Sequence, residues 1–176
     1  MNEMMEMCPS LEFFVDGVEL EIQRPGEYEE QKRWYSGKKK MHSVKNLVIT
    51  DKKKHILVLS ESVEGKTHDK KLLDDAHIPW YPDSQAMMDL GFVGYAHPNL
   101  QLVMPTKKPY KKDLSEEQKA QNKIVSSIRI GVEHAIGGIK RNHIVHDLFR
   151  NHKDGFMDQV MLVSAGLHNL RIDSRT

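Results

Sequence analysis

The 176-residue sequence contains one cysteine, Cys8, and lacks any long apolar run. A single cysteine excludes an internal disulfide framework and fits a reducing compartment. Residues 1–10 carry acids where a secretory peptide needs lysines, and no later run reaches the roughly 18 apolar residues of a membrane span. We therefore expect one soluble, cytoplasmic domain, large enough to bury a core.

The sequence also has little net charge, +1 at pH 7, but its positive residues are unevenly distributed. Residues 32–45 contain six lysines and arginines and no acid, and residues 107–112 contain four lysines. Such blocks suit a polyanion better than a neutral substrate. For either block taken alone, a solvated lysine-rich loop is the structural alternative.

Hydrophobic patterning predicts an α/β order of elements. Residues 23–41, with Pro25 and Gly26, form a long excursion after the first strand. Thr67 or Asp69 is expected to cap a short helix. The pattern predicts strands at 11–22, 43–50, 55–62, 86–88 and 100–104, and helices at 68–78, 115–139 and 156–170, the second opened by a capping box of Ser115 and Gln118.

Two aspartates stand at the predicted strands. Asp16 lies within the first strand, where a carboxylate is costly unless something pairs with it. Asp89 ends a later strand just before Gly91, and the ends of parallel strands are where α/β sites gather. A hydrogen-bonded core acid and an ordinary turn cap are the structural alternatives.

Arg129, Glu133 and Lys140 share one narrow stripe of the long predicted helix, at about 0°, 40° and 20° around its axis. The stripe borders the apolar face, although an exposed Arg129–Glu133 ion pair is the structural alternative. Three carboxylates from two strands and a helix suit Mg²⁺, a hard ion that prefers oxygen ligands. Two such ions roughly 4 Å apart can promote in-line displacement at phosphorus.

Six sequence blocks together resemble the DDE superfamily transposases of bacterial insertion sequences, a group that also resembles harbinger-type transposases. In order, they are VDGVE, WYSGKKKMHSVK, GKTHDKKLLDD, DLGFVGY, RIGVEHAIGGIK and SAGLHNLR. The resemblance implies a ribonuclease-H-like α/β fold, in which a three-strand meander and parallel strands form a mixed sheet flanked by helices. It also implies a catalytic domain at residues 12–172, a short N-terminal extension at 1–11 and a tail at 173–176.

The resemblance implies a nuclease and strand-transfer site with two Mg²⁺ ions, for which Mn²⁺ substitutes. Asp16, Asp89 and Glu133 match the three catalytic and metal-binding acids. Asp69 and His68 are expected beside these ligands, with Asp69 as the alternative second acid. The order of elements favours Asp89, since it follows the strand after the crossover helix whereas Asp69 opens that helix.

The expected partner is DNA, as transposon ends and as target. Residues expected to contact it combine basic charge with one aromatic ring: Tyr35, Lys38, Lys39, Lys40, Lys107, Lys108, Arg129, Lys140 and Arg141. Synapsis of two transposon ends implies a homodimer, and DNA binding implies association with the nucleoid.

About ten residues precede the first predicted strand, whereas related transposases have a helical end-binding region there. We therefore expect either a truncated copy or a second reading frame that works with an upstream-frame end-binding protein. The expected function is metal-dependent DNA cleavage and strand transfer during transposition. Two alternatives stay open: a catalytically silent or co-opted remnant that only binds DNA, and a ribonuclease or resolvase on the same fold.

Overall fold

The computed structural model describes residues 10–175, so Cys8 and most of the N-terminal extension lie outside the described residues. A seven-stranded mixed sheet forms its centre, with the main order β2-β3-β1-β6-β7 and with β4 and β5 paired to β3. The strands are β1 (Glu12–Glu21), β2 (Tyr35–Ser36), β3 (Met41–Thr50), β4 (Ile56–Leu59), β5 (Val63–Glu64), β6 (Ser84–Met87) and β7 (Leu100–Val103).

Strand directions divide the sheet into two parts. Strands β1, β3 and β4 form an antiparallel meander, whereas β1, β6 and β7 run parallel. A parallel pair needs a crossover, and the chain between β4 and β6 supplies it through α3 (Asp69–Asp75). The mixed α/β class and the meander with parallel strands are confirmed, as expected of a ribonuclease-H-like fold.

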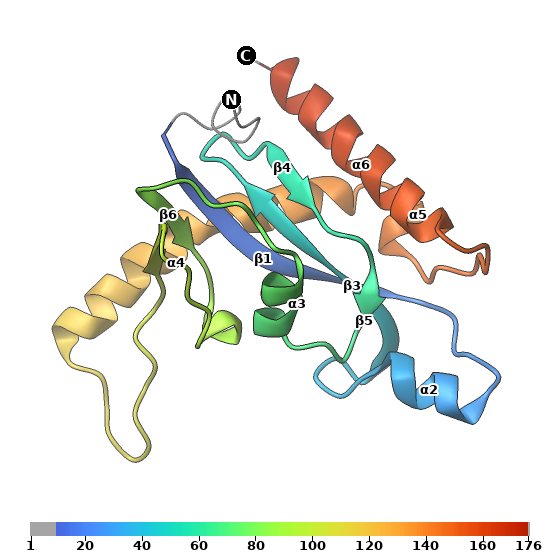
Figure 1. Cartoon of the computed structure of the whole chain (residues 1–176), viewed down its shortest axis with the longest axis horizontal. Helices are drawn as coiled ribbons and strands as arrows, with labels where there is room; N and C mark the ends of the chain where they lie inside the picture. The colour runs from blue at the N-terminus through green and yellow to red at the C-terminus, as the bar shows by residue number, and fades with distance from the viewer. Residues whose placement is uncertain (1–9, 176) are drawn as a thin grey trace.

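Helices cover both faces of this sheet. In Figure 1, α3 lies in front of the strands, whereas α4 (Glu116–Ile139) passes behind them and α6 (Phe156–Asp173) runs along the meander side. The remaining helical elements are short, namely α2 (Tyr28–Trp34), the 3-10 helix η1 (Leu90–Phe92) and α5 (His143–His146). No helix in residues 10–175 combines the length and the apolar composition that a membrane crossing requires.

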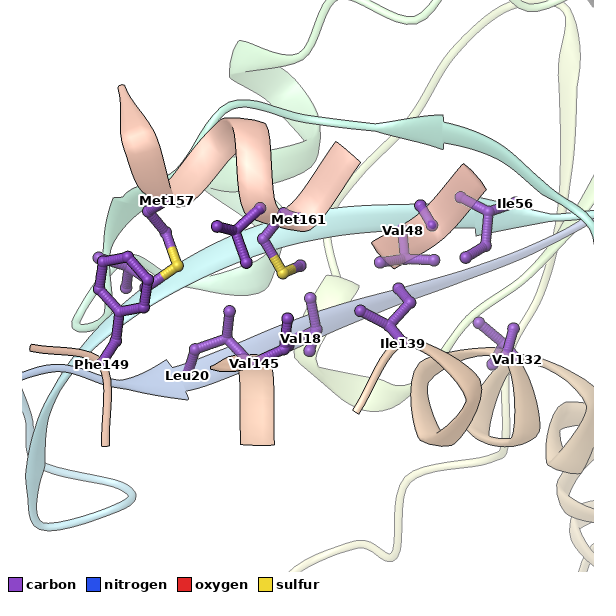
Figure 2. Packing of buried hydrophobic residues seen from close by; sticks show 14 of the residues in the cluster. Val18, Leu20, Val48, Ile56, Val132, Ile139, Val145, Phe149, Met157 and Met161 are labelled. Atoms are coloured by element: carbon purple, nitrogen blue, oxygen red, sulfur yellow. The ribbon is translucent and has the colours of Figure 1, made fainter. Parts of the chain in front are cut away.

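The alternation along β1 produces two cores. Phe13 and Val15 pack with Leu73 of α3 on one face of the sheet. Phe14 and Val18 point to the other face, where α4, α5 and α6 cover the strands. Figure 2 shows apolar side chains of α4 and α6 converging on β1 and β3 there, including Val132, Ile139, Met157 and Met161. The alternation also directs Asp16 toward the α4 face.

The ends of the helices test the sequence predictions of capping. Ser115 and Gln118 form the expected reciprocal capping box at α4. At α3 the prediction of a Thr67 or Asp69 cap was wrong, because His68 is the N-cap and its side chain makes no capping hydrogen bond. Thr67 and Asp69 are instead engaged by Lys45, whose Nζ donates to the Thr67 carbonyl and pairs with the Asp69 carboxylate.

Candidate active site

Asp16 lies in β1, between β3 and β6 in the sheet. Its Oδ1 accepts a hydrogen bond from the Gly17 amide at 2.8 Å, and its Oδ2 lies 3.3 Å from Nη2 of Arg129 on α4. The costly mid-strand carboxylate therefore has a cationic partner from across the helix–sheet interface. That contact also joins the first strand to the long helix at this point.

Asp89 follows the end of β6, the strand that pairs in parallel with the first part of β1. The parallel β1–β6 pairing ends where Phe14 lies opposite Met87, two residues before Asp16 and Asp89, and the Asp89 carboxylate is close enough to raise the pKa of Asp16. Neighbouring strands lie about 4.8 Å apart. Asp89 Oδ1 also accepts from the Gly91 amide at 2.8 Å and caps η1, so the turn-cap interpretation is confirmed and the metal-binding role stays a prediction.

Asp69 joins these two acids from α3. A Cβ on Gly91 would collide with Asp69 Oδ2 and would lie 2.9 Å from Asp89 Oδ1. A Cβ on Gly17 would lie 3.0 Å from Asp69 Oδ1. The carboxylates of Asp69 and Asp89 therefore share the space over one glycine, and Asp69 also approaches the backbone next to Asp16. We call Asp16, Asp69 and Asp89 the acidic cluster.

Like charge accumulates in the acidic cluster. Burial is the main cause that raises the pKa of Asp16, and the carboxylates of Asp89 and Asp69 raise it further, against the opposing effects of Arg129 and the Gly17 hydrogen bond. The buried ammonium of Lys45 lies 3.2 Å from Asp69 Oδ1, and the exposed one of Lys38 lies 4.0 Å from Oδ2. Both lysines thus face Asp69, whereas Arg129 is the cation that faces Asp16.

The α4 stripe runs along β1. At its start Arg129 contacts Asp16, and at its end Lys140 Nζ donates to the Glu19 carbonyl at 3.3 Å. Burial, and then the charge of Lys39, lower the pKa of Lys140. Among the described residues Arg129 pairs with Asp16 and not with Glu133, so the simple surface ion pair within the helix does not form.

Glu133 lies between these two residues on α4 but is exposed. It lines a cavity together with Lys54 and His134, and the carboxylates that raise the pKa of Asp16 do not include it. Within residues 10–175, no three acidic, histidine or cysteine side chains converge closely enough to enclose a metal ion. The structure thus places Asp16, Asp69 and Asp89 near one another, without the three enclosing a metal position, and leaves Glu133 apart.

The donor chemistry of the acidic cluster fits a divalent cation. Hard cations such as Mg²⁺ prefer carboxylate oxygens, and a bound positive charge would offset both the burial and the neighbouring carboxylates that raise the pKa of Asp16. Arg129 now supplies part of that charge from α4. The Nε of Arg129 is buried without a hydrogen-bond partner in the described structure, so its present position leaves one donor unsatisfied.

The two predicted basic loops lie differently. In the first, Lys38 approaches Asp69, and Lys39 lies close enough to Lys140 to lower its pKa, so this loop borders the acidic cluster. Tyr35 is exposed, with its ring edge against His42. In the second loop, between β7 and α4, Lys107 and Lys108 are exposed, and Lys108 pairs with Asp113.

Sequence reasoning missed three groups that the structure brings to these surfaces. Lys45 is buried beside Asp69, and the signal for it was a lysine inside an otherwise apolar strand. His168 and Arg171 of α6 line the cavity that Glu133 shares. Both occur in the SAGLHNLR block, but helical spacing alone does not indicate which residues of α4 they meet. His68, by contrast, was predicted to lie beside the metal ligands, and the structure places it exposed at the start of α3.

A family model of DDE superfamily endonucleases matches residues 15–169, which include the acidic cluster and Glu133. The chain belongs to the DDE superfamily endonuclease family. It is also 32% identical over 174 residues to the probable transposase for insertion sequence element IS702 of Microchaete diplosiphon. That alignment covers 97% of this chain and 61% of the relative, so the chain spans less than two thirds of the relative's length. No solved structure matches the chain.

Proposed function

We propose that this chain is the catalytic domain of an insertion-sequence DNA transposase, which cleaves DNA and transfers its strands with the help of divalent metal ions. The observation that carries the proposal is the proximity of Asp16 and Asp89 at neighbouring parallel strands of a DDE-family chain. The name of the IS702 relative, a probable transposase, supports the same assignment.

In this proposal Asp16 and Asp89 hold Mg²⁺, with Glu133 as the third acid and Mn²⁺ as a substitute metal. Two such ions would supply activation of a water or 3′-hydroxyl and stabilisation of the leaving oxygen. Asp69 is the alternative ligand, since its carboxylate shares the space over Gly91 with that of Asp89. Glu133 is supported by its place on the α4 stripe, one turn beyond Arg129.

The chain's own cations would order the acids and hold the DNA. Arg129 orients Asp16 through the 3.3 Å contact with Oδ2, and Lys45 fixes Asp69 from inside the sheet. The exposed lysines of the first basic loop lie beside the acidic cluster and suit contacts with backbone phosphates. Lys107 and Lys108 are exposed in the β7–α4 connection and would contact DNA phosphates as well.

The assembly that we propose contains transposon-end and target DNA, two copies of this chain and an upstream-frame protein that recognises the ends, acting at the nucleoid. These elements rest on the family resemblance and on the name of the relative, a probable transposase. A catalytically silent remnant that binds DNA is the competing function. The separation of Glu133 from Asp16 and Asp89 is the observation that favours it.

Nicking of supercoiled plasmid DNA with Mg²⁺ or Mn²⁺ tests the proposal. We expect the purified chain to nick, and Asp16→Asn, Asp89→Asn or Glu133→Gln to lower the rate by at least about a thousandfold, since a catalytic metal contributes several kcal/mol to the transition state. Asp69→Asn should lower it only about tenfold if Asp69 acts beside the ligands. Unchanged thermal unfolding would show that each variant is folded.

The outcomes separate the two candidate functions and the two candidate acids. Absence of nicking by the wild-type chain, with DNA binding retained, would support the silent remnant. Equal losses for Asp69→Asn and Asp89→Asn would show that the second acid is shared or wrongly assigned. Full activity of Glu133→Gln would remove Glu133 from the site.

A further inference from the structure

A basic cavity of about 440 Å³ opens between the C-terminal half of α4, the end of α6 and the β3–β4 turn. Four cationic side chains line it, namely Lys54, Arg141, Arg171 and Arg175. Among its lining residues, all within the described part of the chain, Glu133 is the one acid. Positive charge from three separate elements therefore converges on one hollow.

The arginines of this basic cavity have no carboxylate partner among the described residues. Within residues 10–175, no ion pair joins Arg141, Arg171 or Arg175 to a carboxylate. By contrast, the two lysines of α3 each pair with an aspartate one turn further along the same helix. Burial, followed by the charges of Arg141 and Arg175, lowers the pKa of Arg171. A bound anion would relieve this repulsion.

His168 holds the innermost arginine in place. Its Nε2 lies 2.9 Å from the Lys54 carbonyl oxygen, which only accepts, so Nε2 carries the proton. Its Nδ1 then accepts from Arg171 Nη2 at 3.0 Å. Burial lowers the pKa of His168, which keeps the ring neutral as this arrangement requires.

Two glycines of α4 form the wall of the cavity. Gly138 lets His168 and Arg171 approach the helix, since a Cβ there would collide with His168 Nδ1 and lie 3.0 Å from Arg171 Nη2. Arg171 Nη2 also donates to the Gly138 carbonyl at 3.3 Å. A Cβ on Gly137 would meet no heavy atom within 4 Å, so that part of the wall is open.

We infer that the basic cavity binds a backbone phosphate of the DNA on which the proposed nuclease acts, an inference that rests on the proposed function. Guanidinium groups match phosphate oxygens in a two-pronged geometry, and several of them converge here. Glu133 of α4 and Arg141, two residues beyond the end of α4, both line this cavity. A strand held in the cavity therefore reaches Glu133 within a few nucleotides.

The test measures binding of a short fluorescein-labelled DNA duplex by fluorescence anisotropy over a series of salt concentrations, with EDTA present so that cleavage plays no part. The variant is Arg141→Gln/Arg175→Gln, because both side chains are exposed and make no side-chain hydrogen bond in the described structure. The control is Lys119→Gln/Lys123→Gln, which removes the same charge from the exposed first half of α4. Thermal unfolding of each variant checks the fold.

We expect the arginine variant to lower the slope of log affinity against log salt by about 1 and to weaken binding roughly tenfold near 0.1 M salt. The lysine control should leave the slope unchanged. Equal effects of both variants, or no effect of the arginine variant, would overturn the inference. Binding of inorganic phosphate that depends on these arginines, without any change in DNA binding, would assign the cavity to free phosphate instead.

Because the measurement needs no metal, its failure is distinct from failure of the proposed cleavage. A chain that nicks plasmid normally while Arg141→Gln/Arg175→Gln binds DNA like the wild type loses only the cavity assignment. A chain that never nicks, with DNA binding weakened by the arginine variant, keeps the phosphate site and loses the catalytic proposal.

Discussion

Two clusters of like charge lie near α4, and their counter-charges differ. On the sheet side, the acidic cluster is half-buried and receives Arg129 and Lys45 as internal counter-charges. On the α6 side, the guanidinium groups of the basic cavity receive none from the described residues. The first cluster is therefore held together before any ligand arrives, whereas the second presents its charge to an incoming anion.

In each cluster, a glycine allows the side chains to approach closely. Gly91 lets the carboxylates of Asp69 and Asp89 share one space, and Gly138 lets His168 and Arg171 meet the wall of α4. In each case a single Cβ would occupy the place of a charged or polar side chain. A glycine at each close approach thus leaves room for the charged side chains of each cluster.

The largest expected effect comes from filling the acidic cluster. Gly91→Ala should lower the rate of metal-dependent plasmid nicking by about a hundredfold, because displacement of reacting groups by about 1 Å costs that much. Gly131→Ala on α4 is the matched control, since a Cβ there meets no heavy atom within 4 Å. A Gly91→Ala chain with wild-type activity would show that the carboxylates do not need their close approach.

The next largest effect concerns the basic cavity and is measured as a change in the free energy of unfolding. Gly138→Ala should lower the free energy of unfolding by about 1–3 kcal/mol, because His168 and Arg171 have to move aside. Gly137→Ala should raise it by up to about 1 kcal/mol, since alanine favours a helix and the space is open. Urea unfolding of both variants makes the comparison, which fails if the two substitutions shift stability in the same direction.

The smallest effect is a pH dependence at Asp16. Its folded pKa is raised above the usual 3.8, so the folded chain holds this proton more tightly than the unfolded chain. The free energy of unfolding therefore falls as pH rises from below 3.8 through the raised pKa. Asp16→Asn should stabilise the protein near neutral pH and less in acid, as measured by thermal unfolding at both. A gain that grows in acid would contradict this sign.

Much of the site's placement follows from periodicity. A period of two along the first strand puts Asp16 on one defined face, and a helical period puts Arg129, Glu133 and Lys140 on one stripe. Both patterns are intrinsic to the backbone, and the structure has the same alternation and the same stripe along β1. The end of a strand likewise predicted where Asp89 would lie.

The ion-pair partners of the charged residues could not be predicted from the sequence. Spacing within α4 made Glu133 the natural partner of Arg129, yet the guanidinium pairs with Asp16 across the helix–sheet interface. Lys45 similarly finds Asp69 by crossing from a central strand to α3. Such contacts depend on how elements pack, which a pattern within one element does not contain. The basic cavity, assembled from three elements, was missed for the same reason.

Helix α2 was missed because it has no buried face. None of its residues is buried, and it is supported by exposed pairs one turn apart, Lys32 with Glu29 and Arg33 with Glu30. Apolar periodicity is the main sequence signal for a helix, and this segment has none. Its charged residues were instead interpreted as part of a long excursion between two strands.

The most direct test of the central claim, that the acidic cluster is a divalent-metal site, is Mn²⁺ binding followed by electron paramagnetic resonance of the free ion. We expect the wild-type chain to bind Mn²⁺ and Asp16→Asn/Asp89→Asn to bind at least about a hundredfold more weakly. Asp74→Asn/Asp75→Asn removes two exposed acids from α3 and should bind like the wild type. Equal Mn²⁺ affinity in the wild type and in Asp16→Asn/Asp89→Asn would contradict the account.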